Sequence, residues 1–138
     1  MSKHRPIPTS LQFFEKLQWL DGRPLLKTIE PYRRHIFTEA LDSFDPDGRP
    51  SFNLVLCGRA KKNWKTADLI LAGLYRLLVW PSDKGNDGFI LANDEGQAGD
   101  DLSLAKKLIP ANDVLRHELK LSPKAITRKD GKGARLFT

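Results

Sequence analysis

Cysteine, methionine and long hydrophobic runs are all scarce in this sequence. The single cysteine, Cys57, excludes an internal disulfide, and because no other metal-ligating side chains stand near it, we expect a buried, inert thiol. The longest apolar run, Leu69–Trp80, contains Arg76 and is too short to span a bilayer. The opening residues, MSKHRPIPTS, lack the apolar stretch of a secretory signal peptide. These absences predict an intracellular, soluble protein that is not secreted and has no membrane partner.

The chain does have the composition of one globular domain with an excess of positive charge. Its 138 residues suit a single domain with one core, and its 40% hydrophobic and 29% charged content is ordinary for a soluble fold. The formal charge of +6 and the pI near 9.6 allow a nucleic acid or a nucleotide as partner but do not require one. A basic protein with no nucleic-acid role therefore stays open at this point.

The first fifty residues predict two helices and a loop. Thr9 and Gln12 have the spacing of a capping box, and apolar residues at near-helical spacing continue as far as Leu20. Pro31 marks the first turn of a second helix. The apolar face of that helix is expected to hold Tyr32, Ile36, Phe37, Ala40 and Leu41. Residues 42–50, DSFDPDGRP, are dense in Asp, Pro and Gly and predict a surface loop.

The middle of the chain predicts a strand–helix–strand unit. Phe52–Cys57 is almost wholly apolar, as are strands that are buried on both faces of a parallel sheet. A long helix is expected over Lys65–Trp80 and a second apolar strand over Gly88–Ala92, which together complete a βαβ unit. The next predicted helix, Gln97–Ile109, has acidic residues early and lysines late, in the order that suits the helix dipole.

The last part of the chain changes character. Short alternating stretches predict hairpin strands over Val114–Leu121, Ala125–Arg128 and Ala134–Phe137. We therefore expect one α/β domain in three parts: a helical lead-in over residues 1–50, the βαβ unit and its following helix over 51–109, and hairpin strands over 110–138.

The stretch GRAKKNWKT, residues 58–66, links the predicted strand to the predicted long helix and is strongly basic. The first amides of a helix have no internal partner and carry partial positive charge, so a strand-to-helix junction can bind phosphate. In phosphate-binding loops a lysine contacts the β- and γ-phosphates, and a Ser or Thr hydroxyl ligates Mg²⁺. Lys65 and Thr66 stand where that arrangement needs them.

Two positions depart from the usual phosphate-binding loop. Counting back from Lys65, the pattern G-x-x-x-x-G-K requires glycine at the positions of Arg59 and Trp64. The glycine that is present, Gly58, comes one position early, and a tryptophan does not readily take a positive φ. The spacing alone leaves open a basic loop whose cations are simply solvated, namely Arg59, Lys61, Lys62 and Lys65.

The same stretch resembles the phosphate-binding loop of the large subunit of tailed-phage terminases, the ATP-driven motors that pack DNA into proheads. Lys62-Asn63-Trp64-Lys65-Thr66 matches the second half of an Arg-Lys-Asn-Gly-Lys-Ser/Thr type of loop, with tryptophan for glycine, and Gly58-Arg59 matches its opening. Glu30-Pro31-Tyr32 precedes the loop, where the family has a Pro-aromatic-Gln segment, and Gln97-Ala98 opens a later helix. The resemblance covers roughly residues 24–138.

This resemblance implies the N-terminal part of a P-loop NTPase domain that binds ATP and Mg²⁺. Lys65 would contact the phosphates, Thr66 the metal ion, and Arg59 would sense the γ-phosphate. Tyr32 and Arg33 would lie on the adenine side, with Arg33 in the place of the family's adenine-reading glutamine. The remaining loop residues of the implied site are Gly58, Lys62, Asn63 and Trp64. The implied partners are double-stranded DNA, the terminase small subunit and the portal, in the bacterial host cytoplasm of a phage or prophage.

Phe89–Glu95, FILANDE, resembles a Walker B strand, an apolar run ending in an Asp-Glu pair that holds Mg²⁺ and activates water. The alternative is that Asp94 caps the next helix and Glu95 lies in its first turn. In terminases the strand after the loop helix carries no catalytic acid, which favours the alternative. Walker B, the catalytic glutamate and the nuclease domain would then lie beyond Thr138. This chain would be a truncated fragment of an ATPase, inactive alone and marginally stable.

Two other functions are compatible with the sequence. One is a small basic nucleic-acid-binding protein without a nucleotide site, in which the basic segment Lys120–Arg135 follows a phosphate backbone. The other is a different P-loop NTPase, such as a helicase-like protein. Loss of Mg-ATP binding in Lys65→Ala would distinguish the terminase motor from the nucleic-acid-binding protein. Motifs further along the sequence would distinguish the terminase from another P-loop NTPase.

Overall fold

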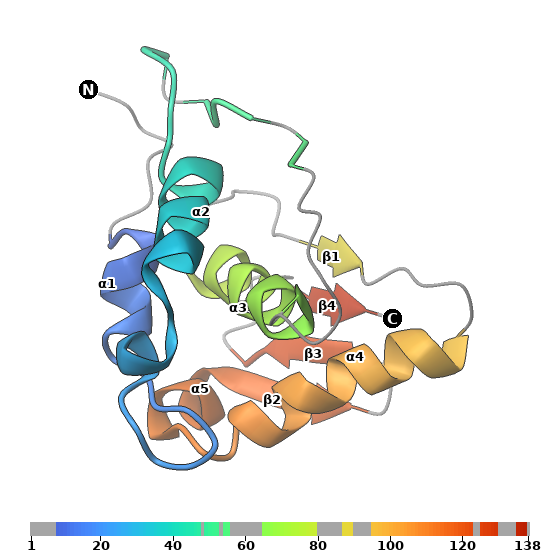
Figure 1. Cartoon of the computed structure of the whole chain (residues 1–138). Helices are drawn as coiled ribbons and strands as arrows, with labels where there is room; N and C mark the ends of the chain where they lie inside the picture. Colours follow the sequence, from blue (N-terminus) through green and yellow to red (C-terminus); the bar gives the residue numbers. More distant parts are fainter. Residues whose placement is uncertain are drawn as a thin grey trace.

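The computed structural model (Figure 1) describes residues 8–47, 49–52, 54–55, 65–79, 87–89, 95–122, 125–129 and 135–137. Within these ranges helices and strands occur together, so the general α/β class expected from the sequence is confirmed. Helix α3 (Lys65–Leu78) lies in the middle. The N-terminal helices pack on one side of it, and the sheet and helix α4 pack on the other.

Helix α1 (Ser10–Phe14) begins with the predicted capping box. The Thr9 hydroxyl accepts from the Gln12 amide at 3.3 Å, and the Gln12 side chain accepts from the Thr9 amide at 3.0 Å. The helix is shorter than expected and does not continue toward Leu20. Beyond it the chain folds into a tight turn, closed by Gly22 at a φ of 88°, a conformation that only glycine adopts readily.

Helix α2 (Pro31–Leu41) follows the short 3₁₀ helix η1 (Leu25–Thr28) and has Pro31 in its first turn, as predicted. Its buried residues are Arg33, Phe37 and Leu41, which recur every four residues. The expected apolar face was therefore only partly right: Phe37 and Leu41 are buried, whereas Tyr32 is exposed. The first buried position of α2 is occupied by Arg33, a charged residue with partners inside the protein. A prediction based on apolar residues alone does not include such a residue in the buried face.

The loop predicted over residues 42–50 is present and is tied back on itself. Phe44 and Pro50 form an isolated antiparallel bridge. The Asp45 carboxylate accepts from the amides of Asp47 and Arg49, each at 2.9 Å, which is the turn chemistry expected of aspartate. Asp45 therefore acts here as a turn former.

The sheet contains four short strands among the described residues: β1 (Asp87–Phe89), β2 (Leu119–Ser122), β3 (Ala125–Arg128) and β4 (Arg135–Phe137). Their order is β1-β4-β3-β2, with β1 parallel to β4 and the other pairs antiparallel. Helix α4 (Glu95–Leu108) lies between β1 and the rest of the sheet in the sequence and packs on α3. The predicted hairpin strands are thus confirmed in large part.

One predicted strand is half wrong. The alternation over Val114–Leu121 resolves into helix α5 (Asp113–Glu118) followed directly by β2. Asn112 stands before the helix and Asp113 lies in its first turn, where negative charge favours the helix dipole. These local signals at the helix start outweigh the period-two pattern of the apolar residues.

The predicted buried strand over Phe52–Cys57 is wrong for the described residues of that range. Phe52, Leu54 and Val55 lie outside any strand, and Leu54 is 70% exposed. An apolar run becomes a strand only when a neighbouring strand pairs with its backbone. The Ser51 amide donates to the Ser43 carbonyl at 2.9 Å, which joins Ser51 to the preceding loop. The described residues that follow Ser51 lie at the surface.

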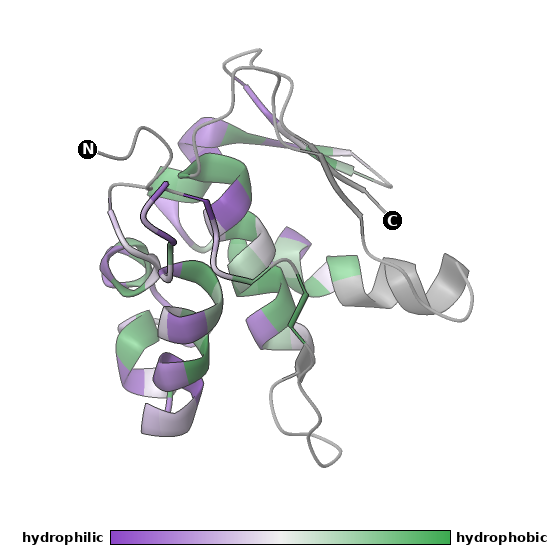
Figure 2. Ribbon diagram, turned by 90° about the horizontal axis from the view of Figure 1, so that it is seen from above, coloured by the Kyte–Doolittle hydropathy of each residue, from purple (hydrophilic) through white to green (hydrophobic). Residues whose placement is uncertain are grey.

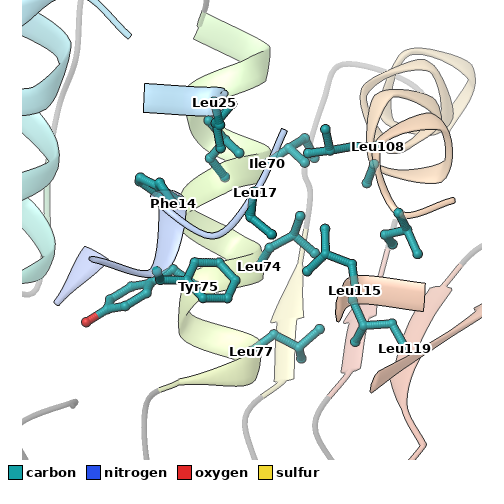
Figure 3. Packing of buried hydrophobic residues seen from close by; sticks show 14 of the residues in the cluster. Phe14, Leu17, Leu25, Ile70, Leu74, Tyr75, Leu77, Leu108, Leu115 and Leu119 are labelled. Carbon is teal, nitrogen blue, oxygen red and sulfur yellow. The ribbon is translucent and has the colours of Figure 1, made fainter. Parts of the chain in front are cut away.

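Among the described residues, one hydrophobic cluster joins the helices to the sheet. Leu74 and Tyr75 in α3 meet Phe14 and Leu17 on one side and Leu115 on the other (Figure 3). The remaining labelled members of the cluster are Leu25, Ile70, Leu77, Leu108 and Leu119. Seen from above, the sheet lies along one side of the central helices, and hydrophobic and hydrophilic residues alternate around the N-terminal helices (Figure 2). The core fixes the position of α3, whose first turn is the candidate site.

Candidate phosphate-binding site at the start of helix α3

Helix α3 begins at Lys65, within the basic stretch GRAKKNWKT. Lys65 and Thr66 are therefore both in the first turn, and Thr66 is half-buried. The free amides of that turn and the helix dipole give this end of α3 a partial positive charge. The other loop residues of the predicted site lie outside the described residues: Gly58, Arg59, Lys62, Asn63 and Trp64.

The first turn of α3 also holds an acidic residue that the sequence reasoning did not single out. Asp68 is only 7% exposed, and its carboxylate accepts from the guanidinium of Arg33 in helix α2, which is 1% exposed. Arg33 Nη2 donates to Asp68 Oδ1 at 2.7 Å, and Arg33 Nε donates to Oδ1 and Oδ2 at 3.0 and 3.2 Å. This is a bidentate, charge-assisted contact, which is stronger than a hydrogen bond between neutral groups.

Arg33 also reaches the residues in front of its own helix. Its Nη1 donates to the Thr28 carbonyl at 2.9 Å and to the half-exposed carboxylate of Glu30 at 3.3 Å. One guanidinium thus joins the end of η1, the start of α2 and the start of α3. The resemblance placed Arg33 on the adenine side of the site. In the structure, its guanidinium donates to Thr28, Glu30 and Asp68 inside the protein.

Two apolar side chains flank this ion pair in the sequence and are exposed. Tyr32, the other adenine-side candidate, precedes Arg33 and is 45% exposed. Leu69 follows Asp68 and is 55% exposed.

The acidic pair of the Walker B-like stretch is only partly described. Strand β1 ends at Phe89 and helix α4 begins at Glu95, so Glu95 lies in the first turn of a helix, as the capping interpretation predicts. Asp94 lies outside the described residues. Among the residues that the structure describes, no group of three or more His, Cys, Asp or Glu side chains is arranged to hold a metal ion.

Basic side chains are exposed on the β2–β3 hairpin and on α5. Lys120, Lys129 and Arg116 are all exposed, while Arg128 is half-buried and donates to the Leu77 carbonyl at 3.3 Å. Arg116 is paired with Asp113 one turn earlier. The basic segment predicted over Lys120–Arg135 is thus in part a solvent-facing surface. In the same described ranges, no helix combines the length and the hydrophobicity needed to cross a membrane.

Comparison of the chain with protein-family models, with curated proteins and with solved structures gives no significant match. The functional interpretation therefore rests on the residues of this chain and on their geometry.

The pairing of Arg33 with Asp68 was the main feature that the sequence reasoning missed. A signal for it was present, because Asp68 is the lone acidic residue in the apolar stretch ADLILAGLYRLLVW. A carboxylate on the buried face of a helix requires a cation or donors close by. The identity of the cation could not be read from the sequence, since Arg33 lies 35 positions earlier in another helix.

Proposed function

We propose that this chain is the ATP-binding, N-terminal part of a tailed-phage terminase large subunit, the motor that packages double-stranded DNA into proheads. The observation that supports this proposal most directly is the start of helix α3 at Lys65, within the basic stretch. The start of the helix, the lysine Lys65 and the hydroxyl residue Thr66 occur together there, as a phosphate-binding loop requires. The proposal extends to Mg²⁺ as cofactor and to the small subunit and portal as partners.

In this proposal each residue has a definite role. The Lys65 ammonium contacts the β- and γ-phosphates, the Thr66 hydroxyl ligates Mg²⁺, and Arg59 senses the γ-phosphate. The remaining loop residues of the proposed site are Gly58–Trp64, in which Trp64 stands where the usual loop has a glycine. Tyr32 provides a stacking surface for the base, and because Arg33 is engaged with Asp68, selectivity for adenine over guanine is weak.

The test is Mg-ATP binding by the 138-residue chain, measured by isothermal titration calorimetry. The wild type binds, and Lys65→Ala lowers the affinity at least about tenfold because a full positive charge at the phosphates is lost. Lys107→Ala is the matched control: it removes the same charge from an exposed lysine in the last turn of α4 and leaves the affinity unchanged. Equal affinities for wild type and Lys65→Ala would contradict the proposal.

A second candidate function is favoured by the exposed lysines of the hairpin. Lys120 and Lys129 face solvent on adjoining parts of the β2–β3 hairpin, where they could contact a phosphate backbone in a protein without a nucleotide site. In that case, Lys120→Ala makes the salt dependence of DNA binding shallower by about one unit of log–log slope, and Lys65→Ala does not affect Mg-ATP. The first function therefore predicts that Lys65→Ala weakens Mg-ATP binding, whereas the second predicts that Lys120→Ala changes the salt dependence of DNA binding.

A further inference from the structure

The four-stranded sheet has one face that packs on the helices and one that is turned away from them. Residues paired directly across neighbouring strands lie on the same face, and successive residues of a strand alternate between faces. Leu119 and Ile126 belong to the packed face, since both are buried in the core cluster. Arg128, which pairs with Leu119, is on that face as well and donates to the Leu77 carbonyl of α3 at 3.3 Å. The opposite face, which includes Lys120, is the outer face and lies away from the central helices (Figure 2).

The register of the strands places a row of polar residues across the outer face. Lys120 in β2 pairs with Thr127 in β3, and Thr127 pairs with Arg135 in β4. Asp87 in β1 pairs with Arg135 and completes this basic row. The Lys120 side chain is exposed and that of Thr127 is half-buried. Because neighbouring strands lie about 4.8 Å apart, the backbones at Lys120 and Arg135 are separated by roughly 10 Å, with the acidic residue at the far edge of the row.

A second row on the outer face combines aromatic residues with small ones. Phe89 in β1 pairs with Phe137 in β4, and Phe137 pairs with Ala125 in β3. Ala125 pairs in turn with Ser122 in β2. Each of these residues is two positions from a member of the basic row, which separates the two rows by about 7 Å along the strands. Two adjacent aromatic positions therefore stand directly beside a row that contains two cations.

Another exposed cation lies at the end of strand β3. Lys129 is exposed, and its Nζ donates to a backbone carbonyl of α5 at 3.0 Å, which leaves two further N–H groups of the ammonium. The Lys129 amide donates to the Glu118 carbonyl at 2.9 Å, so this acidic residue is at the same end of the sheet. Together with Lys120 and Arg135, Lys129 gives three cations against Glu118 and Asp87, which stand at the margins of the face. The excess of positive charge favours a polyanion as the partner.

We propose that the outer face of the sheet binds single-stranded nucleic acid. Cations contact the phosphates of such a strand, and its unpaired bases stack on aromatic side chains. The basic row supplies the contacts to phosphate, and the positions of Phe137 and Phe89 supply stacking for two bases. A duplex has no unpaired base to stack, so only a single strand uses both rows. This inference goes beyond the proposed ATP site and is independent of it, because strands and not the start of α3 form the outer face.

The test is the binding of a fluorescein-labelled oligothymidylate of about 20 nucleotides, followed by fluorescence anisotropy at several salt concentrations and compared with a duplex of equal length. The wild type binds the single strand at least about tenfold more tightly than the duplex. Lys120→Ala weakens binding and makes the log–log salt dependence shallower by about 0.7, the value for one phosphate contact on a single strand. Lys16→Ala is the control: Lys16 is exposed just after α1, on the other side of α3, and its replacement leaves the affinity within about twofold and the slope unchanged.

The aromatic row is tested separately from the charge. Phe137→Ala weakens binding of the single strand at least about fivefold and keeps the wild-type salt slope, because stacking releases no counterions. Phe137→Tyr keeps an aromatic ring and binds within about twofold of the wild type. Circular dichroism of each variant shows whether it is folded, since a residue with only a structural role would weaken binding together with a loss of the wild-type spectrum.

Several outcomes would overturn the inference. These are equal or tighter binding of the duplex, wild-type affinity in Phe137→Ala, or an unchanged salt slope in Lys120→Ala. If Phe137→Ala does not fold, Phe89→Ala takes its place, and the duplex comparison and Lys120→Ala decide as before. Preference for the duplex with a slope that depends on Lys120 would instead support the second candidate function. A chain that binds no Mg-ATP leaves this inference unaffected, and failure of the oligonucleotide to bind leaves the proposed ATP site unaffected.

Discussion

At the scale of single residues, Asn112 is a polar side chain that connects two parts of the chain 94 residues apart. It is 5% exposed, and its Oδ1 accepts from the Gln18 amide at 2.7 Å. Its Nδ2 donates to the carbonyls of Gln18 and Leu108 at 3.0 and 3.1 Å. One amide side chain thereby satisfies three backbone groups, two of them in the turn after α1 and one in the last turn of α4.

Replacing Asn112 by alanine should be among the most damaging single changes outside the apolar core. Asn112→Ala leaves the three backbone groups without their partner, and we expect a loss of about 2–3 kcal/mol of unfolding free energy. Urea denaturation followed by circular dichroism measures it. Gln18→Ala is the control, because it keeps the backbone groups and removes only the exposed contact of Nε2 with the Ala111 carbonyl. Equal effects of the two substitutions would contradict this account of Asn112.

At the scale of elements, α3 shows which features a sequence specifies well. The helix was predicted from its apolar pattern and begins at the predicted residue, because most of its apolar residues lie on the face that packs in the core. Strand β3 matches the prediction residue for residue for the same reason. The prediction of a strand was wrong for the described residues of Phe52–Cys57, because the formation of a strand depends on a partner elsewhere in the chain. The Arg33–Asp68 pair could not be predicted, since its two residues come from different helices.

The two faces of α3 provide a matched test of its packing. Leu74 is fully buried among residues from α1, α5 and the central helix, and Leu69 is 55% exposed on the same helix. Leu74→Ala should cost about 2–5 kcal/mol through lost burial and the cavity left behind. Leu69→Ala should change stability by less than about 0.5 kcal/mol, with the same change in helix propensity. Comparable losses in urea denaturation would show that the central position of α3 is wrong.

At the scale of the whole molecule, one core spans both sides of α3, so the chain should unfold as one unit. Ile29, after η1, is 2% exposed, and Ile126, in β3, is fully buried; both belong to the same cluster. Ile29→Val and Ile126→Val should each lower the unfolding free energy by roughly 1 kcal/mol. Each should shift the same single transition, with circular dichroism and tryptophan fluorescence coinciding. Two separate transitions, one sensitive to each substitution, would contradict a shared core.

The hydrogen bonds between Gln18 and Asn112 also have a consequence for folding during synthesis. Ribosomes release the chain from its N-terminus, so the turn after α1 emerges long before its partner, 94 residues later. Until Asn112 has emerged, the backbone groups of Gln18 lack this side-chain partner. The turn after α1 is therefore completed only when the second half of the chain has been synthesised, and this is the interval in which a chaperone would be most useful.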